Sequence, residues 1–310
     1  MLGVKIGKLS LSSPVIMMSG IFSYGEIDIG YLDYSRIGAI VTKTITLEPR
    51  EGNPQPRIWE AGSGMLNSIG LQNPGISAFI RDGMYKAGKK GVKTIVSIAG
   101  KDPKEVLRMM ELLAEKDVKA VEINLSCPNV DRDRPMISQS AKRTYRLIRE
   151  VKTAFSGTTL IAKLSPNVTS ISDIAVSAEQ AGADALSLIN TVKGMCVDIK
   201  NRRIIEGGLS GPPIKPAGLK AVYDVFSRVD IPLIGIGGIE KDRDALEYIL
   251  AGALAVGVGS GFFSNPMLPG EIYDAVKSFM AENNFKKVAE MAGLLNEKKE
   301  KISSGRKKGK

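Results

Sequence analysis

The chain has 310 residues, enough for two average domains or one large α/β barrel, and its 43% hydrophobic and 25% charged residues are ordinary for a globular protein. Two cysteines are too few for a disulfide framework or an iron–sulfur cluster, and no apolar run approaches the roughly 20 residues that a membrane-spanning helix needs. Half of the net charge of +10 lies in the last ten residues, KISSGRKKGK, which predicts a solvated tail rather than a surface that binds nucleic acid.

The first 14 residues lack a basic head followed by an apolar stretch, so we expect no signal peptide and a reducing, cytoplasmic setting. From there on, eight short apolar runs of strand length recur along the chain. They are PVIMMS (14–19), AIVTKT (39–44), TIVSIAG (94–100), AVEINLSC (120–127), LIAKLSP (160–166), ALSLINT (185–191), PLIGIGG (232–238) and LAVGVGS (254–260).

Segments of helical pattern separate these runs, most clearly at 103–116, 139–155, 171–181, 215–229 and 242–251. Apolar strands that alternate with helices are typical of a parallel sheet whose outer side is covered. Eight such units predict closure into a (β/α)₈ barrel of the TIM type, with the active site at the carboxyl ends of the strands. We expect one barrel domain over residues 1–291 and a basic, disordered tail over 292–310.

Two stretches, 45–75 and 193–213, are too long for plain connections. They follow the second and sixth predicted strands, so both belong to the carboxyl end of the barrel. Long ordered loops in compact domains tend to be functional, and we expect these two to border the site.

Polar residues collect at the carboxyl ends of the predicted strands. A strand that only packs a core has no use for lysine or asparagine at its end, so a bound polar ligand is indicated. In chain order these residues are Ser19, Lys43, Thr44, Ser97, Asn124, Cys127, Lys163, Asn190, Thr191, Gly237, Gly238, Gly259 and Ser260.

The seventh and eighth predicted strands end in GIGG (235–238) and GVGS (257–260), each before a helical segment. Glycine lets the backbone approach a ligand, and N–H groups at a helix start attract phosphate. Barrels often bind phosphate after these two strands, so a phosphorylated ligand is expected there. Tight packing of the backbone is the alternative reason for glycine at these positions.

Six motifs, in their order and spacing, resemble the class 1 dihydroorotate dehydrogenases. They are NSIGLQNPG (67–75), EINLSCPNV (122–130), KLSPNVT (163–169), INT (189–191), GGLSGPPIKP (207–216) and GIGG (235–238). The first two are long and specific, and the resemblance extends over residues 1–291. EPREGNPQPR (48–57) and SGPPIKP are similar to the class 1B catalytic subunit, which passes electrons to a separate FAD and iron–sulfur protein.

The resemblance implies FMN as the cofactor and the oxidation of dihydroorotate to orotate, a step of de novo UMP biosynthesis. It implies FMN contacts from Ser19, Lys43, Thr44, Asn124, Lys163, Ile189, Gly211, Gly237, Gly238, Gly259 and Ser260. It implies substrate contacts from Lys43, Asn67, Ser68, Ile69, Gly70, Leu71, Asn124, Asn190 and Thr191. Asparagine amides suit the ring N–H and C=O groups, Lys43 suits the carboxylate, and Lys163 suits the charge of a reduced flavin.

Cys127 fits the remaining role, the base that takes a proton from C5 while a hydride leaves C6 for flavin N5. The chain contains no histidine, the commonest base. A thiol with a pKa of about 8.5 serves if its surroundings favour the thiolate. Cys196 has no comparable setting, and we expect it to be structural.

The resemblance to class 1B also implies partners: an FAD and iron–sulfur subunit, joined to a homodimer of this chain in a heterotetramer. The sequence departs from that class twice. Ser97 stands where those proteins usually carry an asparagine that touches the flavin, and the loop NVDRDRPMISQS after Cys127 lacks their Gly-Gly and Phe-Gly elements. The second departure concerns how the substrate is covered.

Three other functions are compatible with parts of this pattern. A dihydrouracil or dihydrothymine dehydrogenase subunit performs the same chemistry, but its substrates lack a carboxylate for Lys43. A tRNA-modifying flavoenzyme similar to the dihydrouridine synthases needs a C-terminal helical domain, and only about 50 residues follow the last predicted strand. A non-catalytic barrel that holds a phosphate ligand gives no purpose to the asparagines and Cys127.

Overall fold

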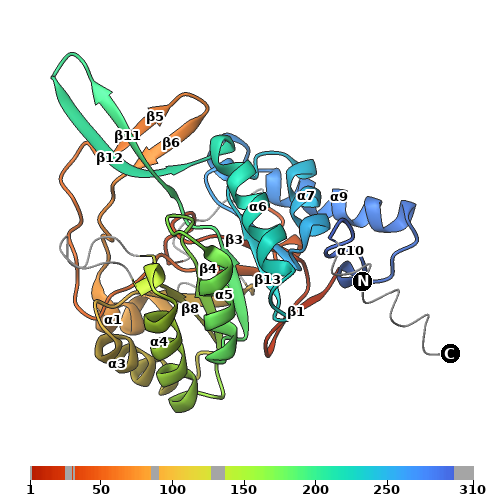
Figure 1. The fold of residues 1–310 in the computed structure, drawn as a ribbon, viewed down its shortest axis with the longest axis horizontal. Helices are drawn as coiled ribbons and strands as arrows, with labels where there is room; N and C mark the ends of the chain where they lie inside the picture. The colour runs from red at the N-terminus through yellow and green to blue at the C-terminus, as the bar shows by residue number, and fades with distance from the viewer. Residues whose placement is uncertain (1, 25–29, 31, 85–90, 127–136, 297–310) are drawn as a thin grey trace.

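The apolar runs form strands that close on themselves. A computed structural model describes residues 2–24, 30, 32–84, 91–126 and 137–296, and at its centre eight parallel strands make a closed barrel (Figure 1). Each strand of the barrel pairs with the next one along the chain, and the last pairs with the first, so the predicted barrel is confirmed. The strands are β3 (Val15–Met17), β4 (Ala39–Val41), β7 (Lys93–Ile98), β8 (Ala120–Asn124), β9 (Thr159–Lys163), β10 (Ala185–Leu188), β13 (Leu233–Ile236) and β14 (Ala255–Val258).

Helices surround the barrel where the sequence predicts them. Three begin at a capping side chain: Asp102, Ser140 and Ser170 each accept a hydrogen bond from a backbone N–H three residues on. The longer helices are α3 (Pro103–Ala114), α4 (Ala141–Ala154), α5 (Ile171–Gln180), α6 (Lys215–Phe226), α7 (Asp242–Ala251) and α9 (Leu268–Glu282).

Shorter elements fill the connections and the bottom of the barrel. They are β1 (Val4–Ile6), β2 (Leu9–Leu11), η1 (Tyr34–Arg36), α1 (Gly75–Ala78), η2 (Phe79–Gly83), η3 (Ile137–Gln139), η4 (Pro212–Ile214), α8 (Gly261–Ser264) and α10 (Val288–Met291). The β1–β2 hairpin was not expected from the sequence. It buries Ile6, Leu9 and Leu11 in the core.

The two long stretches that we predicted as loops contain four strands. They are β5 (Ile58–Ala61), β6 (Gly64–Asn67), β11 (Val192–Asp198) and β12 (Arg203–Ser210), and together they form one antiparallel sheet in the order β11-β12-β6-β5. Figure 1 shows this sheet projecting from the barrel. Pairing of Gly208 with Asn67 joins segments about 140 residues apart, which the sequence pattern of either segment does not reveal.

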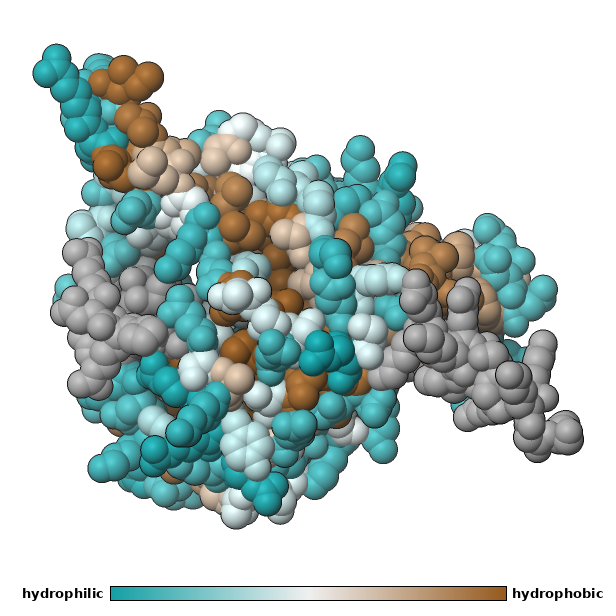
Figure 2. Space-filling model, viewed as in Figure 1, coloured by the Kyte–Doolittle hydropathy of each residue, from teal (hydrophilic) through white to brown (hydrophobic). Residues whose placement is uncertain are grey.

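One face of the projecting sheet carries exposed apolar side chains. Ile58, Met195, Val197 and Ile204 are each more than half exposed, and the register of the strands places them on the same side. Figure 2 shows the brown side chains at this projection. On the opposite side of the same sheet, Leu66 is buried.

The end of the chain continues against the barrel beyond the predicted domain limit at residue 291. Gly293 donates a backbone hydrogen bond to Ile249, and the buried Asn296 side chain donates to the carbonyl of Tyr223 at 2.9 Å. The rest of the predicted tail, 297–310, lies outside the described residues. Within them, no helix is long and apolar enough to cross a membrane.

Asn73 ties the segment after β6 back to the end of β4. Its buried amide accepts hydrogen bonds from the N–H groups of Thr46 (3.1 Å) and Gly75 (2.9 Å) and donates to the Thr46 hydroxyl (2.8 Å) and the Leu71 carbonyl (2.7 Å). One side chain therefore serves four backbone or hydroxyl groups that have little access to water.

Replacing Asn73 by alanine should lower the free energy of unfolding by about 2–3 kcal/mol, because buried donors and acceptors lose their partner. Denaturant unfolding measures this. Asn201→Ala is the control, since that amide bonds to Asp198 in an exposed turn. A loss for Asn73→Ala no greater than for the control would contradict this account.

Candidate active site

Polar side chains from four barrel strands meet at the carboxyl end of the barrel, as the sequence predicts. The Thr44 hydroxyl, after β4, lies 3.4 Å from the Ser19 hydroxyl and 3.0 Å from that of Ser97. The Asn124 amide nitrogen, at the end of β8, lies 3.5 Å from the same Thr44 oxygen. These residues are far apart in the sequence, and the parallel barrel brings them together.

A second cluster joins the ends of β8 and β10. The Asn190 amide nitrogen donates to the Ser126 hydroxyl at 2.5 Å and to the side-chain oxygen Oδ1 of Asn124 at 3.3 Å. The Ser126 hydroxyl donates to the same Oδ1 atom at 2.9 Å. Neighbouring Thr191 accepts a hydrogen bond at its backbone oxygen from Asn167. Two amides held side by side present the donors and acceptors that a cyclic amide ligand needs.

Lys163 lies beneath these groups at the end of β9 and is 8% exposed. Its ammonium nitrogen is 3.9 Å from a carboxylate oxygen of Glu122, on β8. Glu122 is 1% exposed and also accepts hydrogen bonds from the hydroxyls of Ser97 (3.1 Å) and Ser187 (2.8 Å). Sequence reasoning missed Glu122, although a lone acid inside the apolar run AVEIN was a signal.

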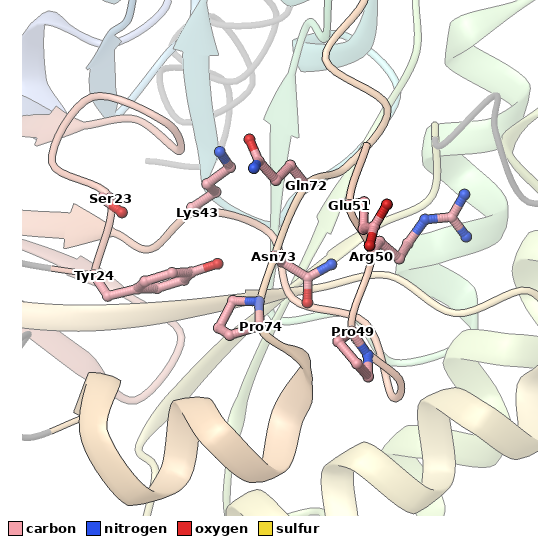
Figure 3. A pocket seen from close by; sticks show the side chains of 9 residues that line it. All are labelled: Ser23, Tyr24, Lys43, Pro49, Arg50, Glu51, Gln72, Asn73 and Pro74. Atoms are coloured by element: carbon pink, nitrogen blue, oxygen red, sulfur yellow. The ribbon is translucent and has the colours of Figure 1, made fainter. Parts of the chain in front are cut away.

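Lys43 lies at the edge of a pocket of about 610 Å³. Burial, and then the positive charge of Arg57, hold the pKa of Lys43 below the ordinary lysine value. In Figure 3 the side chains of Lys43 and Gln72 extend on the same side of the pocket. Arg57 donates to the side chain of Gln72, one of the lining residues, at 2.5 Å, so a second cation lies close to this pocket. Sequence reasoning did not single out Arg57.

This pocket opens beside Lys43 and away from the glycine turns of β13 and β14. Its lining residues come from the segments after β3, β4 and β6: Ser23, Tyr24, Lys43, Pro49, Arg50, Glu51, Gln72, Asn73 and Pro74. It therefore covers only the Lys43 side of the predicted site.

Residues 67–71, predicted to contact substrate, form the end of β6 and a turn after it. The Asn67 amide donates to the Gly208 carbonyl at 3.2 Å, and Ser68 and Ile69 bond to Asn53. Gly70 (φ 75°) and Leu71 (φ 55°) both lie in the left-handed region, which reverses the chain toward Asn73. Hydrogen bonds to Gly208 on β12 and to Asn53 before β5 therefore hold residues 67–69 in place.

The glycine turns show one of the two roles that the sequence left open, the tight packing of the backbone. At Gly238 (φ 68°) a Cβ atom would lie 2.7 Å from the Lys215 nitrogen and 2.9 Å from the Gly211 oxygen, so backbone packing requires glycine there. Gly211 (φ 91°) and Gly237 (φ 119°) are also left-handed, and Ile189 packs under Gly237. These three glycines serve the protein's own backbone.

Gly259 differs from these three glycines. Apart from its chain neighbours, no atom of the described residues lies within 4 Å of the place that a Cβ atom would take, and its φ is not left-handed. The next residue, Ser260, precedes the short helix α8. The chain can therefore carry a side chain at 259 without strain. Among the described residues, neither packing nor backbone conformation requires glycine at this position.

Tyr248 on α7 supports the turn after β13. Its hydroxyl donates to the carbonyls of Gly237 (2.7 Å) and Ile236 (3.3 Å). Burial, and then the nearby carboxylates of Asp244 and Glu247, raise the pKa of this hydroxyl, so it remains a donor. Sequence reasoning missed this residue, because an aromatic on a predicted helix is indistinguishable from ordinary core.

Cys127, the predicted base, lies outside the described residues, as does most of the loop that follows it. Cys196 lies on β11 opposite Ile205 and is half-buried in the projecting sheet. The described residues hold no group of three or more histidine, cysteine or acidic side chains that suits a metal ion.

The family model described as dihydroorotate dehydrogenase matches residues 1–280. Curated relatives include the proteins named dihydroorotate dehydrogenase B (NAD(+)), catalytic subunit, from Caldicellulosiruptor bescii and Trichlorobacter lovleyi. The first is 42% identical over 95% of this chain and 99% of the relative. The second is 44% identical over 95% of this chain and 98% of the relative.

A solved structure, DHODH in complex with ferulenol from Eimeria tenella, has the same fold. It aligns with a TM-score of 0.76 over 94% of this chain and 88% of that chain, at 23% sequence identity.

Proposed function

The chain belongs to the dihydroorotate dehydrogenase family, and on that premise we propose that it oxidises dihydroorotate to orotate with FMN as its flavin and Cys127 as its base. The observation that carries the proposal is the meeting of Thr44, Asn124, Asn190 and Lys163 at one end of the barrel. This set offers amide and hydroxyl partners above a buried cation.

Different residues of the chain orient the substrate ring, attract its carboxylate and remove its proton. The Asn124 and Asn190 amides, with Asn67 on the projecting sheet, orient the substrate ring through its N–H and C=O groups. Lys43, with Arg57 nearby, attracts the carboxylate. Cys127 takes the C5 proton, and FMN would supply the two-electron acceptor for the hydride that leaves C6. The substrate thereby loses one proton and one hydride, which together make it orotate.

FMN fits the residues at the ends of β13 and β14. Gly259 leaves space on its outer side, and Gly211, Gly237 and Gly238 hold the adjoining turns in a left-handed conformation that bulkier residues avoid. A phosphate suits such a turn because backbone N–H groups reach it without side chains between them. Lys163, at the end of β9, would offset negative charge on the reduced cofactor.

Replacing Gly259 by leucine should abolish FMN retention without unfolding the protein, because the side chain enters space that the protein itself does not use. Flavin absorbance and a thermal melt of the purified variant measure the two effects. Gly157→Leu is the matched control: it is equally open but lies before β9, at the other end of the barrel. If Gly259→Leu stays fully yellow, no phosphate approaches this turn.

Replacing Cys127 by alanine should leave FMN and orotate binding intact and slow flavin reduction by dihydroorotate roughly 10²- to 10⁴-fold, the usual range for a lost general base. Cys127→Ser should be nearly as slow at neutral pH, because a hydroxyl is far less acidic than a thiol. Stopped-flow reduction measures these rates.

Cys196→Ala is the control for Cys127, since that residue lies on β11 in the projecting sheet, and its rate should remain close to normal. A wild-type rate of flavin reduction in Cys127→Ala would exclude this cysteine as the base.

The lowered pKa of Lys43 makes the affinity for orotate depend on pH in a defined direction. The carboxylate binds the protonated amine, so affinity should fall as pH rises through the lowered pKa, below the 10.5 of an ordinary lysine. Lys43→Met should bind orotate at least roughly tenfold more weakly and lose this decline. Titrations with orotate, followed by flavin fluorescence across pH, test both points. If the affinity of Lys43→Met for orotate falls equally as pH rises, the fall belongs to a group other than Lys43.

The same cations favour dihydroorotate over the rings of dihydrouracil and dihydrothymine, which lack the carboxylate. The positive charge of Arg57 disfavours the protonated form of Lys43, and an anion bound beside the two cations would offset that repulsion. Steady-state assays with each dihydropyrimidine decide between these substrates.

We further propose that electrons leave through a separate FAD and iron–sulfur subunit and that two copies of this chain form the centre of a heterotetramer. The relatives named as catalytic subunits imply such a partner subunit. The exposed apolar face of the projecting sheet supports contact with other protein chains, because large apolar patches seldom face water. Co-purification from cells that express the chain tests the assembly, and NAD reduction by the isolated chain alone would contradict it.

A further inference from the structure

A carboxylate lies where the barrel interior has almost no water. Glu122 points into the barrel from the middle of β8, and its two oxygens accept hydrogen bonds from Ser97 on β7 and Ser187 on β10. Lys163, on β9, supplies the opposite charge at 3.9 Å. Four different strands thus contribute to one charge pair, and the proposed mechanism gives Glu122 no task.

The carboxylate also orders the hydroxyls above it. An ionised carboxylate only accepts hydrogen bonds, so Ser97 donates to Glu122 and then accepts from Thr44 at 3.0 Å. Thr44 in turn accepts from the Asn124 amide at 3.5 Å. This chain of donors runs from the mouth of the barrel down to Glu122. It gives Ser97 a role within the protein at the position where class 1B proteins carry asparagine.

The net charge of the Glu122–Lys163 pair determines how strongly it favours negative charge on a ligand bound nearby. Lys163 alone would place an uncompensated positive charge in a low-dielectric interior, where it would strongly favour negative charge on a neighbouring group. Glu122 cancels most of that charge from a distance at which it need not touch the ligand. Glu122 attracts the Lys163 ammonium and weakens the attraction of that ammonium for negative charge on a ligand.

We propose that Glu122 is a positioning residue that acts through Lys163, fixing its ammonium and balancing its charge so that bound FMN keeps a potential low enough to pass electrons on. This rests on the proposed function. A flavin beside an unbalanced lysine would hold its electrons too tightly, because reduction places negative charge next to that cation. Ser97 and Ser187 keep the carboxylate in position.

The test is the midpoint potential of the flavin in the purified holoprotein, measured by equilibration with a reference dye. Glu122→Gln keeps shape and hydrogen bonding but removes the charge. It should favour binding of reduced over oxidised FMN by roughly tenfold or more, which raises the potential by about 30 mV for a two-electron couple. Glu111→Gln is the matched control, an ion-paired glutamate exposed on α3, and should leave the potential unchanged.

Repeating the substitution in the Lys163→Met variant separates an effect of Glu122 on the flavin potential through Lys163 from an effect that does not need Lys163. In Lys163→Met there is no ammonium for Glu122 to fix or to balance. Adding Glu122→Gln to Lys163→Met should therefore change the potential little. An equal rise in both backgrounds would overturn the inference, and so would an unchanged potential in Glu122→Gln alone.

Ser187→Ala covers the case in which Glu122→Gln does not fold. It removes one donor to the carboxylate and should raise the potential by a smaller amount, and an unchanged potential there would also count against the inference. A wild-type chain that carries no flavin would refute the proposed function and this inference together. A wild-type flavin that dihydroorotate reduces, with a potential insensitive to Glu122, would refute this inference alone.

Discussion

Closure of eight parallel strands into a ring is the constraint on which the site depends. Because the strands all run in one direction and the ring has no edge, the eight carboxyl ends lie at the same end of the barrel. Asn124 and Asn190 are 66 residues apart and yet their amides meet at 3.3 Å. The same geometry brings the connections after the second and sixth strands together, where they pair as one antiparallel sheet that contains Asn67. A site assembled in this way needs no local motif that contains all of its parts.

The interior of the barrel contains a buried ion pair, which costs desolvation free energy that is not required for packing. Glu122 and Lys163 are both buried, and replacing a buried ion pair by apolar side chains is often neutral or stabilising. Two serine hydroxyls are directed at the carboxylate, which limits but does not remove the cost of taking the charge out of water. Such a pair is weak support for stability and is better understood as part of the electrostatics of the ligand site. Lys43, also at this end of the barrel, has a lowered pKa, first because burial removes water from its ammonium and then because Arg57 adds positive charge nearby.

The sequence predicted the barrel because parallel strands buried on both faces appear as continuous apolar runs, and it predicted the helices because segments of helical pattern separate those runs. It did not predict the projecting sheet, whose strands are partly exposed and pair across about 140 residues, as Gly208 and Asn67 do. Glu122 escaped notice because the direction of a side chain inside a barrel depends on the register of its neighbours, and Tyr248 because an aromatic residue on a predicted helix is indistinguishable from ordinary core. For the glycines, only the structure separates Gly238, which packs on backbone, from Gly259, which faces open space. The role of Cys127 stays a prediction from the sequence.

The central claim is that this chain, through its own flavin, removes two electrons from dihydroorotate. Anaerobic titration of the purified chain with dihydroorotate, followed at the flavin absorbance and by the orotate formed, tests it most directly. The account predicts bleaching that is complete near one orotate formed per flavin, and no comparable bleaching by dihydrouracil at the same concentration. A flavin that dihydroorotate does not reduce, or that dihydrouracil reduces equally well, would contradict it.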